Sequence, residues 1–410
     1  MDTPNESVID LSQARSVDTN GEAFKVSVGQ GGFDSTVSSQ WFSRPDDQKF
    51  LDLNSLYDYT KGHADNSFHS VINVSDIRVE APTDNPDDLR LQIPGKHSGS
   101  SDIEAIPNHW SFGQLATLGK APAGYLRKLP AQIAGINLQY SLANLREESV
   151  KAYVTRDGDN ELRAATGAGY GRVHDYEVVR AVQKIAGNGI GDTNWKVPGV
   201  LNWQDGTYDP NAPITRESTT LFASDRDLFL FLVDDKHPIE IGKLPNGEPD
   251  LIFRGFYVWN SEVGNRSLGI ATFYLRGVCQ NRCIWGVEGY TQTTIRHSSG
   301  APARFAQEAA PALAQFSNQS TNALIEGVKA AKSAKVAHND DSADEFLKGR
   351  GFSKAKSKQV IESVIKEEGH KPRSVWDFVQ GITAVAREEG HQDARINLER
   401  AAGKLLDKVA

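Results

Sequence analysis

Two long apolar segments that lie close together in the chain restrict the possible folds most. DLIFRGFYVWN at residues 250–260 and SLGIATFYLRGVC at residues 267–279 are rich in β-branched and aromatic residues, and only the six residues SEVGNR separate them. Parallel neighbours need a crossover of a dozen or more residues, so this pair is predicted to be antiparallel. Alternation places Ile252 and Phe256 on one side of the first strand and Phe253 and Tyr257 on the other. Because both sides carry bulky residues, the strand is predicted to be central in its sheet.

The surrounding pattern predicts an α+β fold. Shorter strand-like segments at 219–224, 228–233, 238–241 and 283–289 extend the sheet. Residues 301–336 are dominated by Ala, Gln, Glu and Lys and predict one long covering helix, with a possible break at Pro311. Earlier in the chain, residues 109–145 predict three short helices, and a hairpin is predicted around the turn at Asp157 and Gly158. Residues 81–107 lack a periodic apolar face and are interpreted as a loop or inserted segment, and residues 187–220 as a long loop or a lid.

Three regions follow from these patterns. Residues 1–45 are polar and acidic without a sustained period, which is typical of a poorly ordered, mobile N-terminal arm. Residues 46–336 are expected to form the α+β core domain, and residues 337–410 a helical C-terminal unit. In that unit, Ser342 with Glu345 and then Ser374 have the spacing of helix caps.

Composition excludes several classes of protein. No apolar run approaches the ~18 residues that a membrane span needs, and the first residues lack the basic and apolar blocks of a signal peptide. With only two cysteines, Cys279 and Cys283, a disulfide scaffold is excluded. We therefore expect a soluble cytoplasmic protein that makes no membrane contact.

The charges are unevenly distributed. Residues 1–100 hold 16 acidic and 8 basic side chains, whereas the remaining 310 residues hold 37 of each. Within that balanced part, residues 251–335 carry nine Arg or Lys against four Glu. Clustered cations suit a polyanion, and interleaved aromatic rings can stack on exposed bases. The predicted nucleic-acid-binding residues are Arg254, Tyr257, Trp259, Arg266, Arg276, Arg282, Arg296, Arg304, Lys329, Lys332 and Lys335. Residues 346–373 form a second basic stretch, for which a solvated helix face is the preferred interpretation.

Acidic residues near strand ends suggest an alternative chemistry. Carboxylates gathered at the end of a strand are suited to hold magnesium in a nuclease. The candidates for such catalysis are Asp225, Asp227, Asp234, Asp235 and Glu262. Acidic side chains also end strands simply because they remain in water, so the leading hypothesis has no metal and no cofactor.

Two further motifs are weak. GAGYG at residues 167–171 lies between a strand and a helix, but its spacing fits neither common phosphate-binding pattern, which favours a flexible turn. Cys279 and Cys283 with His297 lack a clear fourth ligand for a structural zinc site, so buried thiols are the better interpretation.

Three stretches resemble phage and plasmid proteins that share a domain of unknown function. They begin with HWSFGQLATLGK at residue 109, RGFYVWNSEVGNR at residue 254 and SVWDFVQGITAVAR at residue 374. The resemblance is most specific in the hairpin loop and in the pattern around Arg276 and Cys279. An aromatic residue and an arginine before a helix are also typical, and Tyr170 and Arg172 match them. The resemblance implies a mobile-element setting without an established activity.

These observations lead to a ranked hypothesis. The chain is expected to be a non-enzymatic DNA-binding protein of a mobile element that prefers single-stranded DNA, takes part in recombination or replication, and forms a homo-oligomer. One alternative is a metal-dependent nuclease or other phosphoryl-transfer enzyme. The other is a protein-binding counter-defence factor in which the acidic arm imitates DNA.

Overall fold

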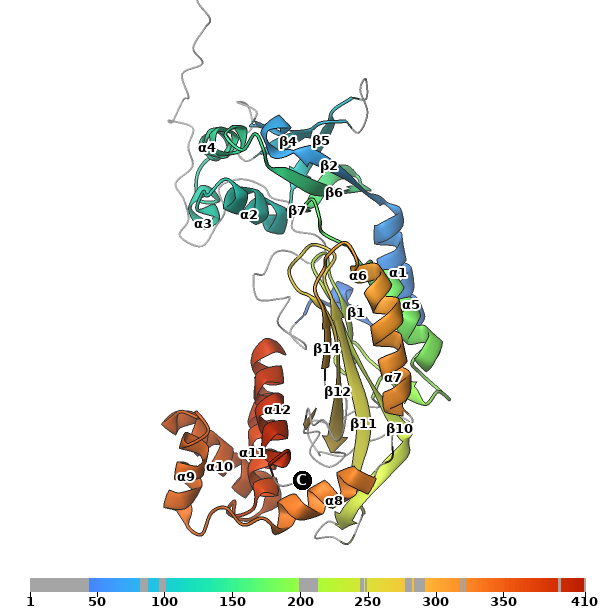
Figure 1. The fold of residues 1–410 in the computed structure, drawn as a ribbon, viewed down its shortest axis with the longest axis vertical. Coiled ribbons are helices and arrows are strands. Elements are labelled where there is room, and N and C mark those ends of the chain that lie inside the picture. Colours follow the sequence, from blue (N-terminus) through green and yellow to red (C-terminus); the bar gives the residue numbers. More distant parts are fainter. Residues whose placement is uncertain are drawn as a thin grey trace, which may run out of the picture. The chain divides into compact units, whose positions relative to one another are not determined.

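The chain forms two compact units. The computed structural model describes residues 44–81, 88–95, 101–198, 213–243, 247, 249–276, 282–283, 292–317, 320, 322–389 and 392–408. The first unit comprises Lys61–Arg172 and Glu262–Asn265; the second comprises 44–60, Val173–Ser261 and the residues from Arg266 onward. Both units contain helices and sheet, which confirms the predicted α+β class (Figure 1). The predicted boundary at residue 337 has no counterpart in this division, and the predicted arm over residues 1–45 lies almost entirely outside the described residues.

A six-stranded mixed sheet organises the first unit. Its order is β2-β6-β7-β5-β4-β3, with β5 parallel to β7 and the other pairs antiparallel. The strands are β2 Ser67–Asn73, β3 Arg78–Glu80, β4 Arg90–Ile93, β5 Ile103–Pro107, β6 Ser149–Asp157 and β7 Asp159–Gly167. The β6–β7 hairpin turns at Gly158, whose φ of 73° suits glycine, and it confirms the predicted hairpin. β4 and β5 correct the predicted loop over 81–107. They are too short to show alternation, yet Leu91, Ile93 and Ala105 are buried.

Three short helices pack on this sheet, as the helix-breaking glycine and proline residues in this segment predict. They are α2 His109–Leu118, α3 Ala123–Leu126 and α4 Ala131–Ala143. Pro122 and Pro130 stand at the N-caps of α3 and α4, where a missing N–H has no cost. The apolar stripe of α4, which includes Leu138 and Leu142, joins the buried core of the sheet.

The second unit contains an antiparallel sheet of eight strands. Its main order is β1-β9-β10-β11-β12-β13, and β8 and β14 add to β10 and β12. The strands are β1 Lys49–Phe50, β8 Trp195–Lys196, β9 Leu221–Ala223, β10 Leu228–Lys243, β11 Pro249–Asn260, β12 Leu268–Arg276, β13 Arg282–Cys283 and β14 Gln292–Ile295. β11 lies between β10 and β12, so the predicted central strand and antiparallel hairpin are confirmed.

The two faces of this sheet bury different side chains. Ile252 and Phe256 belong to the large core that includes the helices, whereas Phe253 and Tyr257 belong to an aromatic cluster on the opposite side. This cluster depends on a close cross-strand contact. A Cβ at Gly269 would lie 2.0 Å from the Trp259 ring, so only glycine fits beneath the indole.

Helices complete the second unit, together with α1 Leu53–Asp65, which begins within it. They are α5 Asp175–Ala186, α6 Ala301–Arg304, α7 Ala310–Ser317, α8 Asn322–Ser333, α9 Asp340–Lys348, α10 Lys354–Glu368, α11 Val375–Glu388 and α12 Gln392–Leu406. The single long helix expected over 301–336 is divided instead. A π-helical turn at Phe305–Ala309 precedes Pro311, which removes one backbone donor and interrupts the regular bonding.

The C-terminal residues are helical, as predicted. Ser374 caps α11 as expected, accepting from the Asp377 backbone N–H. For α9, Asn339 is the cap and Ser342 is the third helical residue, so this helix begins three residues earlier than expected. Within the described ranges, no helix is long and apolar enough to cross a membrane.

Candidate functional site

The central arginines of the predicted basic strip are buried in ion pairs. On β11, Arg254 lies opposite Asp234 of β10, and its Nη2 donates to Asp234 Oδ2 at 3.1 Å. On β12, Arg276 donates from Nε and Nη2 to the two oxygens of Asp250 at 2.8 and 3.0 Å, and from Nη1 to Glu368 at 2.6 Å. Because both guanidinium groups are buried and neutralised by carboxylates, they do not form a solvent-facing phosphate site.

The remaining predicted arginines do not converge into a strip either. Arg266 Nε lies 3.8 Å from Asp227 Oδ2, and exposed Arg304 forms a two-point ion pair with Glu308 one helical turn away. Arg296 is exposed beside β14. Arg282 lies on β13, but its side chain is outside the described residues.

The predicted lysines vary in setting. Exposed Lys329 pairs with Glu326 at 2.9 Å. Lys332 donates to the Ile241 carbonyl at 3.2 Å, with Asp250 Oδ2 at 3.5 Å. Exposed Lys335 forms an isolated backbone bridge with Ser374. Most of these charges are locally compensated, which a count along the sequence does not reveal.

The aromatic residues proposed for base stacking are buried. Tyr257 is 0% exposed, and its hydroxyl donates to Glu399 on α12. Trp259 is 9% exposed above Gly269. The prediction that these two rings stack on DNA is therefore corrected, because both rings are buried. Alternation along a strand shows that both of its faces carry bulky residues, but it does not show whether other parts of the chain cover them.

The predicted catalytic carboxylates are engaged separately. Asp227 accepts from Arg44 at 3.0 and 3.1 Å, and Asp234 accepts from Arg254 and contacts His237 Nδ1. Asp234 lies on β10, seven residues after Asp227, which immediately precedes that strand. At the rise of a strand, this is a separation of about 23 Å. Asp225 lies 3.8 Å from Arg226, and the Asp235 side chain is outside the described residues.

This arrangement does not support the predicted magnesium site. Among the residues that the structure describes, no group of three or more His, Cys, Asp or Glu side chains is placed to hold a metal ion. Of the weak Cys and His set, His297 is buried, whereas Cys279 and the Cys283 side chain lie outside the described residues.

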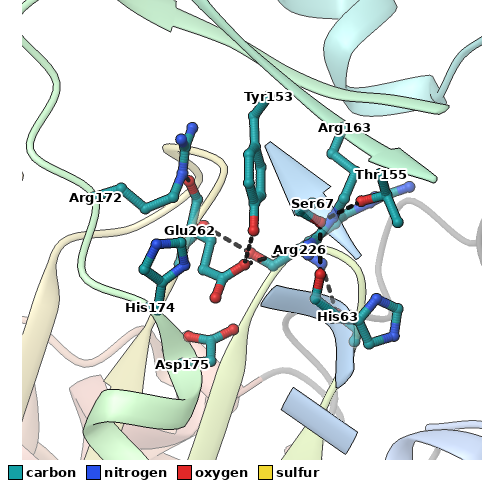
Figure 2. Close-up of polar contacts among 12 residues, drawn as sticks. His63, Ser67, Tyr153, Thr155, Arg163, Arg172, His174, Asp175, Arg226 and Glu262 are labelled. Atoms are coloured by element: carbon teal, nitrogen blue, oxygen red, sulfur yellow. Dashed lines mark hydrogen bonds and ion pairs between the residues drawn. The ribbon is translucent and has the colours of Figure 1, made fainter. Parts of the chain in front are cut away.

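The fifth carboxylate, Glu262, belongs to a buried polar cluster in the first unit (Figure 2). It lies in the loop between β11 and β12. Its Oε2 accepts from the Tyr153 hydroxyl at 3.1 Å and from Arg163 Nη1 at 3.2 Å. The Arg172 Nε donates to the Glu262 backbone carbonyl at 2.8 Å. Burial, followed by the negative charge of Glu262, raises the pKa of Tyr153 to about 12, so this phenol remains a hydrogen-bond donor at neutral pH.

Backbone contacts hold the same loop in the first unit. The Val263 carbonyl accepts from Trp110 Nε1 at 3.0 Å and from Gln114 Nε2 at 2.8 Å, and the Val263 side chain is buried. Gly264 follows with φ of 86°, which glycine readily adopts. Of the loop residues that carry the family resemblance, Glu262 and Gly264 thus belong to the first unit, whereas Asn260 and Ser261 belong to the second.

Arg172 is the least satisfied cation of this cluster. Its guanidinium carbon lies 3.8 Å from the centre of the Tyr153 ring, and the side chain is only 9% exposed. Neither Nη1 nor Nη2 has a hydrogen-bond partner. Figure 2 shows both nitrogens directed away from the Glu262 carboxylate. Burial lowers the pKa of Arg172, as expected for a cation removed from water without a paired carboxylate.

A second candidate surface is formed by helices α2, α3 and α4. Residues 105–146 contain no Asp or Glu and four Lys or Arg, although the chain has 53 acidic residues in 410. Lys120 and Lys128 are exposed there. On α3 and α4, Tyr125 is 60% exposed, Tyr140 is 75% exposed, and Ile136 is also exposed. Exposed rings and cations without nearby acidic residues in the sequence are an arrangement suited to a nucleic acid.

Sequence reasoning missed this surface although its signal is visible in the sequence. Counting acidic residues by region isolates 105–146 directly. Exposure of the two tyrosines was not accessible in that way, because helical periodicity alone does not decide which side of a short helix is covered.

Comparisons with known proteins provide no further assignment. No family model, curated protein or solved structure matches the chain. The resemblance to phage and plasmid proteins accordingly remains an expectation from the sequence.

Proposed function

We propose that the chain is a nucleic-acid-binding protein of a mobile element that holds single-stranded DNA on helices α2–α4 of the first unit. The observation that carries this proposal is the acid-free stretch 105–146, in which exposed Tyr125 and Tyr140 accompany exposed Lys120 and Lys128. This surface replaces the arginines of the sheet as the proposed site of contact.

The chemistry of the surface favours a single strand. Unpaired bases present flat faces that stack on tyrosine rings, an interaction worth about 1–3 kcal/mol per base. Lysine ammonium groups neutralise phosphates without reading the sequence, so binding is expected to weaken with salt and to show little sequence preference. Among the described residues, six large apolar side chains are exposed, and three of them lie on α3 and α4. Single exposed apolar residues are common on protein surfaces, whereas a group of them marks an interaction site.

The alternative functions have weaker support. The carboxylates proposed for a nuclease are engaged by Arg44, Arg254 and Arg163, and they are not gathered at one point. The counter-defence hypothesis depends on the acidic arm, which lies outside the described residues. A DNA-binding measurement separates the counter-defence hypothesis from the proposed function. Only the proposed function requires the surface of α2–α4 to bind DNA.

The proposal is tested by fluorescence anisotropy with a labelled oligothymidylate over a series of salt concentrations. Tyr140→Ala is expected to weaken binding by roughly 5- to 150-fold, the equivalent of one lost stacking contact. Replacing Lys120 and Lys128 with Gln is expected to reduce the salt slope by about 1.4, or about 0.7 for each lost phosphate contact.

Arg304→Ala is the matched control, because it removes an exposed cation of the predicted strip that is already paired with Glu308. Its affinity should equal that of the wild type. Absence of DNA association at low salt, or equal affinity of the wild type and both helical-surface variants, contradicts the proposal.

A further inference from the structure

The side chain of Arg172 has two unused donor groups in a buried position. Its Nε is satisfied by the Glu262 carbonyl, but Nη1 and Nη2 have no partner and the side chain is only 9% exposed. A buried cation is ordinarily paired, because removing it from water is costly. The Tyr153 ring at 3.8 Å offers a cation–π contact, but it accepts no hydrogen bond from these two nitrogens.

Lys151 adds a second positive charge nearby. Its Nζ donates to the backbone carbonyl of Tyr170 at 2.7 Å, and the ring of Tyr170 lies 5.8 Å from the Arg172 guanidinium carbon. Burial, and then the positive charge of Arg172, lowers the pKa of Lys151. The Glu262 carboxylate is already engaged by Arg163 and Tyr153. The cluster therefore contains more buried positive than negative charge.

The turn that precedes Arg172 contains two glycines with open surroundings. Gly167 ends β7 and Gly169 lies in the turn that leads to Arg172, and a Cβ at either glycine would meet no atom within 4 Å. The Tyr170 N–H donates to the Gly167 carbonyl at 2.9 Å, which fixes the turn. Neither position therefore places a side chain over the turn that leads to Arg172.

We propose that Arg172 and Lys151 form a binding site for a phosphate dianion, either free or as the terminal group of a nucleotide. The two terminal nitrogens of Arg172 offer four N–H donors in a planar fork, and the Lys151 ammonium retains two donors beyond the one used by Tyr170. A tetrahedral dianion with several acceptor oxygens can engage both groups, whereas a planar carboxylate uses only the fork. This site is separate from the DNA-binding surface on α2–α4 and does not depend on it.

Isothermal titration calorimetry of the full chain tests the site. Inorganic phosphate and thymidine 5′-monophosphate are titrated separately, each against sodium chloride of equal ionic strength. Saturable binding is expected for at least one of them. Arg172→Gln should raise the dissociation constant at least tenfold, and Lys151→Gln should raise it several-fold. Arg78→Gln is the control, because Arg78 is an exposed arginine of the same unit.

Hydrogen exchange of the wild-type chain provides a measurement that does not require a variant to fold. Bound phosphate should slow exchange of the amides at 167–172, whereas equal ionic strength of chloride should not. Binding of inorganic phosphate identifies a free-anion site, and binding of the nucleotide alone identifies a terminal-phosphate site.

The proposal is overturned if neither ligand titrates, if neither slows exchange at 167–172, or if a folded Arg172→Gln variant binds as tightly as the wild type. Neither ligand contains a DNA strand, so failure here leaves the oligonucleotide result unaffected. Failure of oligonucleotide binding likewise leaves the phosphate result unaffected.

Discussion

Replacing Arg276 with alanine should destabilise the second unit. The substitution removes two donations to Asp250, one to Glu368 at 2.6 Å and one to Gln380 at 3.2 Å, all from a buried guanidinium group. Breaking a buried ion pair costs about 3–5 kcal/mol. Lys332 Nζ remains 3.5 Å from Asp250 Oδ2 and provides partial compensation, so we expect the lower end, about 3 kcal/mol.

Calorimetry and DNA binding together measure this effect. A loss of about 3 kcal/mol corresponds to a fall of roughly 6–12 °C in the melting temperature of a unit of this size. The chain contains two units, which can unfold in two separate thermal transitions. In that case the substitution should lower the midpoint of only one of them. Arg304→Ala breaks an exposed pair and should leave the melting temperature close to that of the wild type. The reasoning is refuted if Arg276→Ala melts with the wild type, or if it weakens DNA binding while leaving the melting temperature unchanged.

Two tyrosine substitutions test the buried polar contacts. Tyr257→Phe leaves buried Glu399 without the tyrosine donor and should cost about 1–3 kcal/mol in urea unfolding, with DNA affinity unchanged. Lost DNA affinity at full stability would contradict the assignment of this hydroxyl to a structural contact. Tyr153 has a folded-state pKa raised to about 12, above its value of about 10 in an unfolded chain, so its contribution is complete below about pH 10 and is lost as the pH rises towards 12. Tyr153→Phe should therefore reduce the fall in unfolding free energy between pH 9 and 11, and equal falls in the two proteins would contradict this assignment.

The sequence predicted backbone organisation better than the surroundings of individual side chains. The two faces of residues 250–260 identified a central antiparallel strand, because alternation depends only on neighbouring residues. The partners of Arg276 were not predictable, since Asp250, Glu368 and Gln380 lie up to 104 residues away in sequence. For the same reason, the charge count indicated a cationic strip whose central arginines are paired in the folded chain.

The candidate sites show the same limit. Tyr170 and Arg172 were noted only through a family resemblance, and nothing in their local sequence shows that the Arg172 terminal nitrogens lack partners. Glu262 was identified as a possible metal ligand, but its partners Tyr153 and Arg163 come from strands 99–109 residues earlier in the chain. Short strands such as β4 and β5 were also missed, because four or five residues carry too little periodic signal.

The assignment of Glu262–Asn265 to the first unit has a consequence for synthesis of the chain. During translation, residues 61–172 are synthesised well before Val263. The hydrogen bonds from Trp110 and Gln114 to the Val263 carbonyl can therefore form only later. A fragment ending at Arg172 would never form them. The first unit is therefore encoded discontinuously, and its last contacts can form only after much of the second sheet has been synthesised.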